Sequence, residues 1–514
     1  MSLVKSTAII ASMTLLSRIS GFVRDVLVAN IIGASWLSDA FFVAFKLPNF
    51  FRRLFAEGAF NAAFVPQFSR NLSEGREQAI RFASEALSVL LVALLLLNGV
   101  FLVFMPVLLQ LFAPGFADEP EKYDLAVSLA RICFPYILFV SVVSLIGGML
   151  NSLGKFAAVA VAPVLLNLSL IAAILILPPY TSTAAHALSF GVFVAGIVQL
   201  LWLLGAAHRA DALPSLLVPR LTARVRTLFR VMAPAALGAG VAQVNLLVDV
   251  VLASTMPEAV SYLYYADRIN ELPIGVIGVA VGTALLPMLS RQLREGQLDA
   301  ARHGMNRAIE LVLLFGLPAA TAMLLIPQPI IQTLYEHGQF TAGDTLATYS
   351  AMMAYAAGLP AFVLIKVLAP GFFANQDTKT PFIIASICVV VNLCLNLLLM
   401  QYYAHVGLAA ATSIAGWLNA GLMALVLYRR SIWRPDAALL LHLPRMLLAC
   451  AVMGVVLVGL YQLLGDTPAH LWGRVLALAA LVVAGMLSYG VCVVAFKAVD
   501  RQQIRASLRR KQQR

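Results

Sequence analysis

Charged residues are scarce in this chain. Asp, Glu, Lys and Arg make up only 12% of its 514 residues, whereas hydrophobic residues make up 61%. A soluble domain carries roughly 25% charged residues, so this composition excludes an ordinary soluble protein. A helix needs about 20 apolar residues to cross a bilayer, and runs of that length recur through the sequence. The composition therefore predicts an all-α polytopic membrane protein.

Motifs for metal binding and catalysis are also missing. The five cysteines form no CxxC pair and the seven histidines are dispersed, which argues against a disulfide framework or a metal centre. The sequence has no GxSxG, HExxH, Walker or Gly-rich dinucleotide motif. Without a nucleotide site, uphill transport must use an ion gradient or the membrane potential. We therefore expect a transporter and not an enzyme, with Na⁺ or H⁺ as the coupling ion and no other cofactor.

The apolar runs predict 14 transmembrane helices. Basic residues such as Arg76, Arg224 and Arg294 follow the even-numbered spans, and acidic residues such as Asp118 and Glu258 follow odd-numbered ones. Because cytoplasmic loops are enriched in Lys and Arg, this alternation predicts that both termini are cytoplasmic. The expected spans are 6–32, 36–66, 83–112, 127–150, 157–177, 184–205, 231–255, 262–289, 308–327, 346–373, 380–401, 406–428, 443–464 and 473–496.

The chain also contains an internal repeat. FVPQFSR at 64–70 is echoed by LLPMLSR at 285–291, and Asn167 matches Asn392 at a similar offset. Six helices fit within this offset, which predicts two six-helix lobes of parallel orientation with a substrate site between them. The expected parts are an N-terminal lobe at 1–205, a basic cytoplasmic linker at 206–230, a C-terminal lobe at 231–428, two extra helices at 429–497 and a basic tail at 498–514.

The second span carries charges inside its apolar run. At helical spacing, Asp39, Lys46, Asn49, Arg53 and Glu57 form one stripe. A charge at membrane depth costs at least ~2.5–3.5 kcal/mol, so we expect these side chains to face a protein interior or a wet cavity. The proline in the middle of the stripe, at position 48, should bend the helix. The stripe indicates either one wall of a solute pathway or a salt-bridge ladder that locks helices together.

Positive charge exceeds negative charge across the spans. Arginine suits bidentate binding of phosphate and carboxylate groups, so the excess predicts an anionic, phosphate-bearing substrate. Internal pairing at helical spacing is the alternative, and it could pair five of the seven cations. The cations are Arg18, Arg24, Lys46, Arg52, Arg53, Arg268 and Lys366, and the anions are Asp25, Asp39, Glu57, Asp267 and Glu271.

Oxygen-bearing side chains in the second lobe form a candidate ion site. Asp249 is the lone carboxylate of its span, Asn392 and Asn396 share one helix face, and Thr412 lies in the next span. Oxygen ligands from three helices could hold Na⁺. The alternative is ordinary hydrogen bonding between helices by Asn and Thr, which is common in membranes.

Five segments of the chain form longer motifs: SRISGFVRD, SDAFFVAFKLPNFFRRLFAEGAFNAAFVP, APGFAD, YYADRINELPIGVIGVAVGTALLP and KVLAPGFFANQDTKTP. These segments resemble those of the MurJ/MviN family, which comprises bacterial inner-membrane flippases for lipid II, the undecaprenyl-pyrophosphate-linked peptidoglycan precursor. The resemblance implies a two-lobe exporter fold in the inner membrane, with the lipid tail in a groove built by residues 429–497. It also implies functional roles for Arg18, Arg24, Asp39, Arg52, Arg268 and Glu271.

The leading functional hypothesis is a monomeric lipid II flippase working by alternating access in cell-wall synthesis. The alternative is a cation-coupled multidrug exporter, or an exporter of another polyprenyl-linked oligosaccharide, with the same fold. Cationic drugs need an acidic or aromatic pocket, whereas these spans are basic. A scaffold that recruits cell-wall synthesis proteins is a third hypothesis, under which the intramembrane charges are structural. The basic tail is expected to lie at anionic headgroups, without binding nucleic acid.

Overall fold

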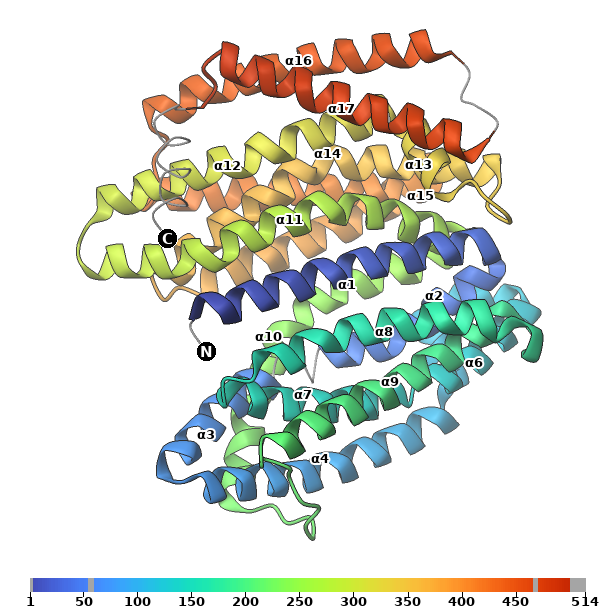
Figure 1. Ribbon diagram of the computed structural model, residues 1–514, viewed down its shortest axis with the longest axis vertical. Helices are drawn as coiled ribbons and strands as arrows, with labels where there is room; N and C mark the ends of the chain where they lie inside the picture. The colour runs from blue at the N-terminus through green and yellow to red at the C-terminus, as the bar shows by residue number, and fades with distance from the viewer. Residues whose placement is uncertain (1–2, 54–59, 466–469, 500–514) are drawn as a thin grey trace. The chain divides into compact units, whose positions relative to one another are not determined.

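The computed structural model describes residues 3–53, 60–465 and 470–499. The described residues are 87% helical and form no β-strand, which confirms the all-α prediction (Figure 1). Nine helices in this described part are long and apolar enough to cross a membrane. The structure therefore agrees with a multi-pass membrane protein, and the count of 14 spans stays a prediction.

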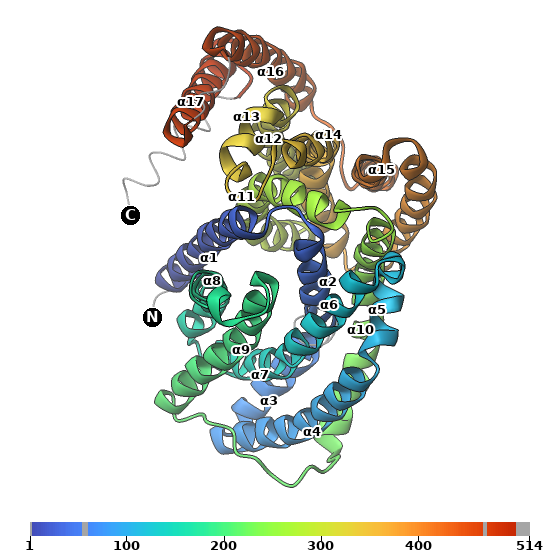
Figure 2. The same ribbon diagram turned by 90° about the vertical axis from the view of Figure 1, so that its right-hand side faces the viewer.

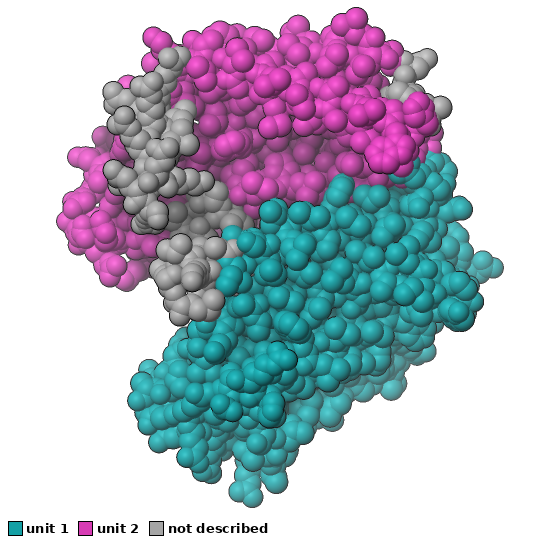
Figure 3. Space-filling model, in the orientation of Figure 1, with its two compact units in different colours: residues 1–261, 337–341 teal, residues 262–336, 342–514 magenta. Residues whose placement is uncertain are grey.

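The contacts within the chain divide it into two compact units, coloured separately in Figure 3. Unit 1 comprises residues 1–261 and 337–341, and unit 2 comprises residues 262–336 and 342–514. The helices of unit 1 are α1 (Leu3–Ile32), α2 (Trp36–Phe51), α3 (Asn61–Glu74), α4 (Arg76–Val103), α5 (Met105–Phe112), α6 (Pro120–Cys133), α7 (Tyr136–Ser152), α8 (Phe156–Ile176), α9 (Ala184–Arg209) and α10 (Ala223–Ala253). Those of unit 2 are α11 (Ala259–Arg294), most of which lies in this unit, α12 (Leu298–Leu325), α13 (Pro327–Tyr335), α14 (Ala342–Phe373), α15 (Lys379–Arg429), α16 (Ala437–Leu464) and α17 (Leu471–Ala495).

Helix α10 packs within unit 1, against α3 and α4. The repeat places this helix in the second lobe, so the contact boundary near Ser261 differs from the boundary predicted at 206–230. An extended segment over residues 212–222 precedes α10 and is held against α4. The backbone N–H of Ser215 donates to Ser84 Oγ at 2.9 Å, and that of Leu217 donates to Ser88 Oγ at 2.8 Å. The hydroxyl oxygens of Ser84 and Ser88 therefore accept hydrogen bonds from backbone N–H groups that have no partner in a helix or strand.

The interior of unit 1 is built from helices packed on helices. Helix α1 packs on α8, and α8 and α7 both pack on α9 (Figure 2). Aromatic residues at four-residue spacing form the core near α3, where the rings of Phe60, Phe64 and Phe68 stack in series and Phe64 also stacks on Phe82. Side chains four apart lie on one face of a helix, which explains the row.

The second predicted span is not one regular helix. Helix α2 contains Pro48 and ends at Phe51, and helix α3 begins at Asn61. Between them the backbone widens into a π-helical turn at Arg52 and Arg53. A proline removes one backbone donor and clashes with the turn before it, whereas α2 ends after Pro48, so the bend expected at Pro48 stays a prediction. Residues 54–59, which include Glu57, lie outside the described part of the chain.

Unit 2 has its own helical core. Helix α14 packs against α12 and α15, α12 packs against α16, and α16 pairs with α17. Helix α15 consists of two helices joined at a kink, since Ala404 has φ 47° and ψ −131°, and this matches the two spans predicted over 380–401 and 406–428. Buried polar contacts fasten α16 to α12, with His442 Nδ1 2.9 Å from Glu310 Oε1 and Arg307 2.7 Å from Asp436.

Candidate functional site

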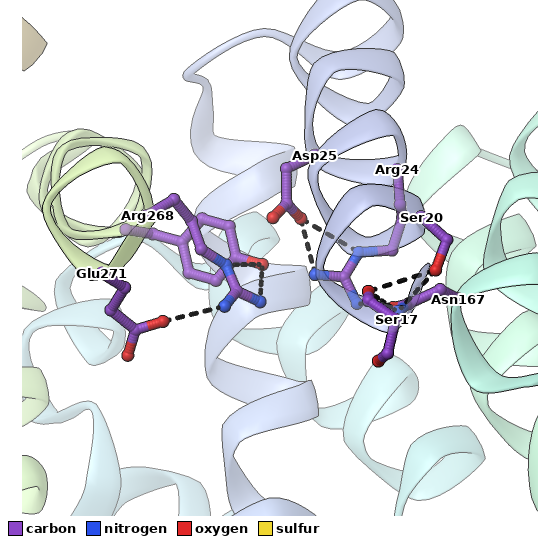
Figure 4. A network of polar contacts seen from close by, with 8 residues as sticks. Ser17, Ser20, Arg24, Asp25, Asn167, Arg268 and Glu271 are labelled. Carbon is purple, nitrogen blue, oxygen red and sulfur yellow. Dashed lines mark hydrogen bonds and ion pairs between the residues drawn. The ribbon is translucent and has the colours of Figure 1, made fainter. Parts of the chain in front are cut away.

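Arg24 is buried in unit 1 and held by a polar network (Figure 4). Its Nε and Nη2 atoms donate to Asp25 Oδ1 at 3.0 and 2.6 Å, and its Nη1 atom donates to Asn167 Oδ1 at 2.9 Å. Asn167 in turn donates to the carbonyl of Ser17 at 2.9 Å and to the hydroxyl of Ser20 at 3.3 Å. The network therefore fixes the guanidinium plane between α1 and α8.

The sequence around Gly21 allows this network to form. A Cβ atom at Gly21 would lie 3.3 Å from Asn167 Nδ2, so any larger residue would press on the amide that orients Arg24. Buried charges are stable only when paired and hydrogen-bonded, and Arg24 meets both conditions. In this conformation the internal-pairing interpretation holds for Arg24, so a phosphate could reach it only by competing with Asp25.

Arg268 is a candidate cation in unit 2, and it is more exposed than Arg24. Its side chain is 34% exposed, and its Nη1 lies 3.1 Å from Glu271 Oε2. The hydroxyl of Tyr264 accepts from Nε and Nη2 at 3.3 and 3.2 Å, and the guanidinium lies 5.1 Å from the centre of that tyrosine ring. A half-exposed guanidinium aligned by an aromatic ring suits recognition of an anionic group. Glu271, at 50% exposed, is a partner that an incoming phosphate could displace.

The remaining predicted cations differ in their surroundings. Arg52 is half-buried and donates to Asn49 Oδ1 at 3.1 Å, and Asn49 donates to the carbonyl of Phe45 at 2.9 Å. Lys46 is exposed on α2. Arg18 is half-buried, whereas Arg53 and Lys366 are exposed. Among the described residues, the ion pairs include none with these last three cations, and Glu57 is outside that part of the chain.

Asp39 lies in a second buried cluster of unit 1, with partners that sequence reasoning missed. Its Oδ2 is 3.0 Å from Lys122 Nζ, and both side chains are almost fully buried. Its Oδ1 accepts from the backbone N–H and the hydroxyl of Ser261 at 2.9 and 2.6 Å. Ser261 is in the first turn of α11, so the carboxylate accepts from one of the N–H groups at the start of that helix, where the helix dipole favours negative charge. The geometry gives Asp39 a structural role, and its predicted contact with substrate stays a prediction.

Three of the four predicted ion ligands meet in α15. Asn396 Nδ2 donates to Asn392 Oδ1 at 3.0 Å, and Asn392 Nδ2 lies 3.5 Å from Thr412 Oγ1. Both asparagines are buried, and Asp249 is a half-buried residue of α10 in unit 1. The contacts match the hydrogen bonding expected of Asn and Thr between helices. The same oxygens form the polar set from which a cation site could be made.

The nine apolar helices in the described part of the chain define the class as a multi-pass membrane protein. The family model described as lipid II flippase MurJ matches residues 28–473. The chain therefore belongs to the lipid II flippase MurJ family, whose members are transporters and not enzymes.

Individual relatives agree with this assignment. The chain is 43% identical to the "Probable lipid II flippase MurJ" of Rhizobium meliloti (strain 1021), over 99% of this chain and 97% of the relative. A solved structure titled "Lipid II flippase MurJ, inward closed conformation" is 26% identical, with a TM-score of 0.79, covering 95% of this chain and 98% of that one. An inward-facing transporter of the multidrug resistance MATE family is 15% identical with a TM-score of 0.67, covering 83% and 98%, which shows a shared fold alone.

Proposed function

We propose that the protein moves lipid II from the cytoplasmic to the periplasmic leaflet of the bacterial inner membrane by alternating access. Membership of the lipid II flippase MurJ family over residues 28–473 carries this proposal. The relatives at high coverage favour lipid II over a drug or another polyprenyl-linked oligosaccharide as the substrate. The protein would then supply peptidoglycan synthesis with its precursor, and membrane lipids would surround it as a monomer with 14 spans and both termini cytoplasmic.

The pyrophosphate of lipid II is the group that we expect the arginines to bind. Arg268 offers a half-exposed guanidinium whose carboxylate partner is itself 50% exposed. Arg24 is held by Asp25 and Asn167 in this conformation. Since a bidentate phosphate contact resembles a carboxylate contact, the substrate could replace Asp25 without leaving the arginine unpaired. Arg18, Arg52 and Arg53 would add positive charge, and Lys46 and Lys366 would attract the anionic head group from exposed positions.

The two C-terminal helices supply a surface for the lipid tail. Helices α16 and α17 pack on each other and expose large apolar side chains such as Val455, Met486 and Leu476. Contact with such an apolar surface is favourable for a polyprenyl chain, as it is for a lipid acyl chain. We therefore place the lipid tail along residues 429–497, as the sequence predicts.

Coupling to an ion gradient would use the polar set of α15. Asn392 forms hydrogen bonds with Asn396 and with Thr412, so a small shift of these side chains could present three oxygens to Na⁺. Transport by the Asn392→Ala variant is then expected to lose its dependence on the ion gradient while substrate binding is retained.

Genetic complementation tests the proposed function in cells. A host depleted of its own flippase is supplied with the chain carrying Arg268→Glu, and membrane abundance of the protein is measured in parallel. We expect the variant to accumulate normally and fail to support growth. The matched control is Arg291→Glu on the same helix, where an exposed arginine pairs with Glu295 at 3.5 Å, and it should support growth. Normal growth with Arg268→Glu would contradict the proposal.

A further inference from the structure

A groove with a volume of about 470 Å³ opens on unit 1 at one end of α8 and α9. Its walls come from α1, the turn that precedes α8, α8 itself and α9. Volumes of about 300–1,000 Å³ are usual for small-molecule sites. The groove contains none of the arginines assigned to lipid II above, so it is a separate feature of the unit.

The groove has an apolar body and a basic mouth. Phe156, Val161 and Leu201 line the body, and Lys155 and Arg209 lie at the ends of α8 and α9. Leu201 and Arg209 are eight positions apart on α9, so the groove follows that helix for about 12 Å at 1.5 Å per residue. Both cations are exposed, and no carboxylate is among the described residues that line the groove. An occupant must therefore combine an apolar chain with an anionic end.

Trp202 forms one wall of the groove, and its orientation is fixed. The indole Nε1–H donates to the carbonyl of Ala158 at 3.0 Å, while the side chain remains 42% exposed. Since this donor is already used, the ring offers an occupant only its apolar face. Tryptophan at such a position is typical of the boundary between the lipid tails and the headgroups.

The floor of the groove is open because small residues build it. Gly205 and Ala206 lie on α9 opposite Ala157 and Ala158 of α8. A Cβ atom built on Gly205 would meet no other atom within 4 Å. A larger side chain there would occupy the groove without displacing any part of the protein.

We propose that this groove binds one anionic phospholipid of the surrounding membrane, with an acyl chain against Trp202 and Leu201 and the phosphate at Lys155 and Arg209. The lining favours a phospholipid over lipid II itself. Apart from the two cations and the occupied indole N–H, the described lining residues carry no polar side chain to recognise sugars or a peptide. The inference requires only that the chain is embedded in a membrane, so it does not depend on the transported substrate.

Native mass spectrometry of the full-length protein, titrated with phosphatidylglycerol or with phosphatidylcholine, tests this site. We expect the wild type to bind one phosphatidylglycerol more tightly than phosphatidylcholine. The Lys155→Gln/Arg209→Gln variant should bind it at least about tenfold more weakly, because charge-assisted hydrogen bonds are lost. The matched control Arg224→Gln/Arg226→Gln removes the same charge from exposed positions outside the groove and should bind like the wild type.

A second variant tests the apolar part of the groove. Gly205→Leu fills the floor, and since leucine favours helix more than glycine does, its thermal stability should not fall. We expect it to lose the bound phosphatidylglycerol, whereas Gly99→Leu, another glycine with open space on its helix surface, should keep it. Three results would overturn the proposal. They are equal affinity of the wild type for both phospholipids, an equal loss of phosphatidylglycerol binding in the charge control, and displacement of the bound lipid by undecaprenyl phosphate but not by excess phosphatidylglycerol.

Discussion

The hydroxyl groups of Ser38 and Ser261 lie 2.8 Å apart, although the two serines are 223 residues apart in the chain. The internal repeat pairs residue 64 with 285 and residue 167 with 392, and the separation between the two serines lies between these two offsets. The contact brings Ser261 to the Asp39 carboxylate, and the parallel arrangement of two lobes stays a prediction.

Removing either partner of the buried ion pair between Asp39 and Lys122 should destabilise the protein. Lys122→Met leaves the carboxylate buried without its cation, and a loss of about 3–5 kcal/mol in the free energy of unfolding is expected. Asp39→Asn should have a similar effect, because the lysine then remains buried and uncompensated. Thermal or denaturant unfolding of the purified variants in detergent measures the change.

The double variant separates a structural role from a substrate-binding role for Asp39. Asp39→Asn combined with Lys122→Met removes both charges, so it should be more stable than the sum of the single losses predicts. If the pair is structural, the double variant should also bind lipid II as the wild type does. Strictly additive losses of stability would contradict the ion pair, and a selective loss of lipid II binding would contradict the structural role.

The extended segment at 212–222 should loosen when its serine partners on α4 are removed. In Ser84→Ala/Ser88→Ala, the backbone N–H groups of Ser215 and Leu217 lose their acceptors and must find water or stay unpaired. Hydrogen exchange at these two amides should accelerate, while exchange in α8 stays unchanged. Unchanged exchange at both amides would show that other contacts hold the segment.

The stability of the protein should depend on pH through Asp377, which lies in the turn between α14 and α15. Hydrogen bonds from the side chain and backbone of Thr380, together with Arg430, lower the pKa of Asp377 to about 2. The unfolded carboxyl titrates near 3.9, so its contribution to stability is fully present above that pH and is lost as the pH falls toward 2. The melting temperature of Asp377→Asn should therefore be below that of the wild type at pH 6 and approach it near pH 2. A difference that is constant with pH would contradict this.

The sequence predicted the helices and the charges within them more completely than it predicted their partners. Periodicity placed Arg24, Asp39 and Arg268 inside apolar spans, because this signal is local. The partners Lys122, Asn167 and Ser261 are distant in sequence and come from helices whose packing no local pattern specifies. The predicted spans 83–112 and 127–150 leave Lys122 in the connection between them, where no pattern indicates that its side chain is only 3% exposed.

The repeat contained a signal for two of the missed partners. Asn167 aligned with Asn392, and each proves to be a buried hydrogen-bonding residue, with Arg24 in one case and Asn396 in the other. Ser261 stands at the repeat offset from Ser38. Comparing polar residues at equivalent positions of the two halves would have identified both. Lys122 lies in an acidic stretch whose sequence resembles a loop, and the repeat gives no comparable signal for it.

Translocation of lipid II by the purified protein in vesicles tests the central claim that arginines within the helices act on an anionic head group. Arg268→Gln is compared with Arg291→Gln, which removes the same charge from an exposed position on the same helix. The account predicts that Arg268→Gln slows translocation at least about tenfold, as expected for the loss of one charge-assisted hydrogen bond, and that Arg291→Gln does not. Equal translocation rates in both variants and the wild type would contradict it.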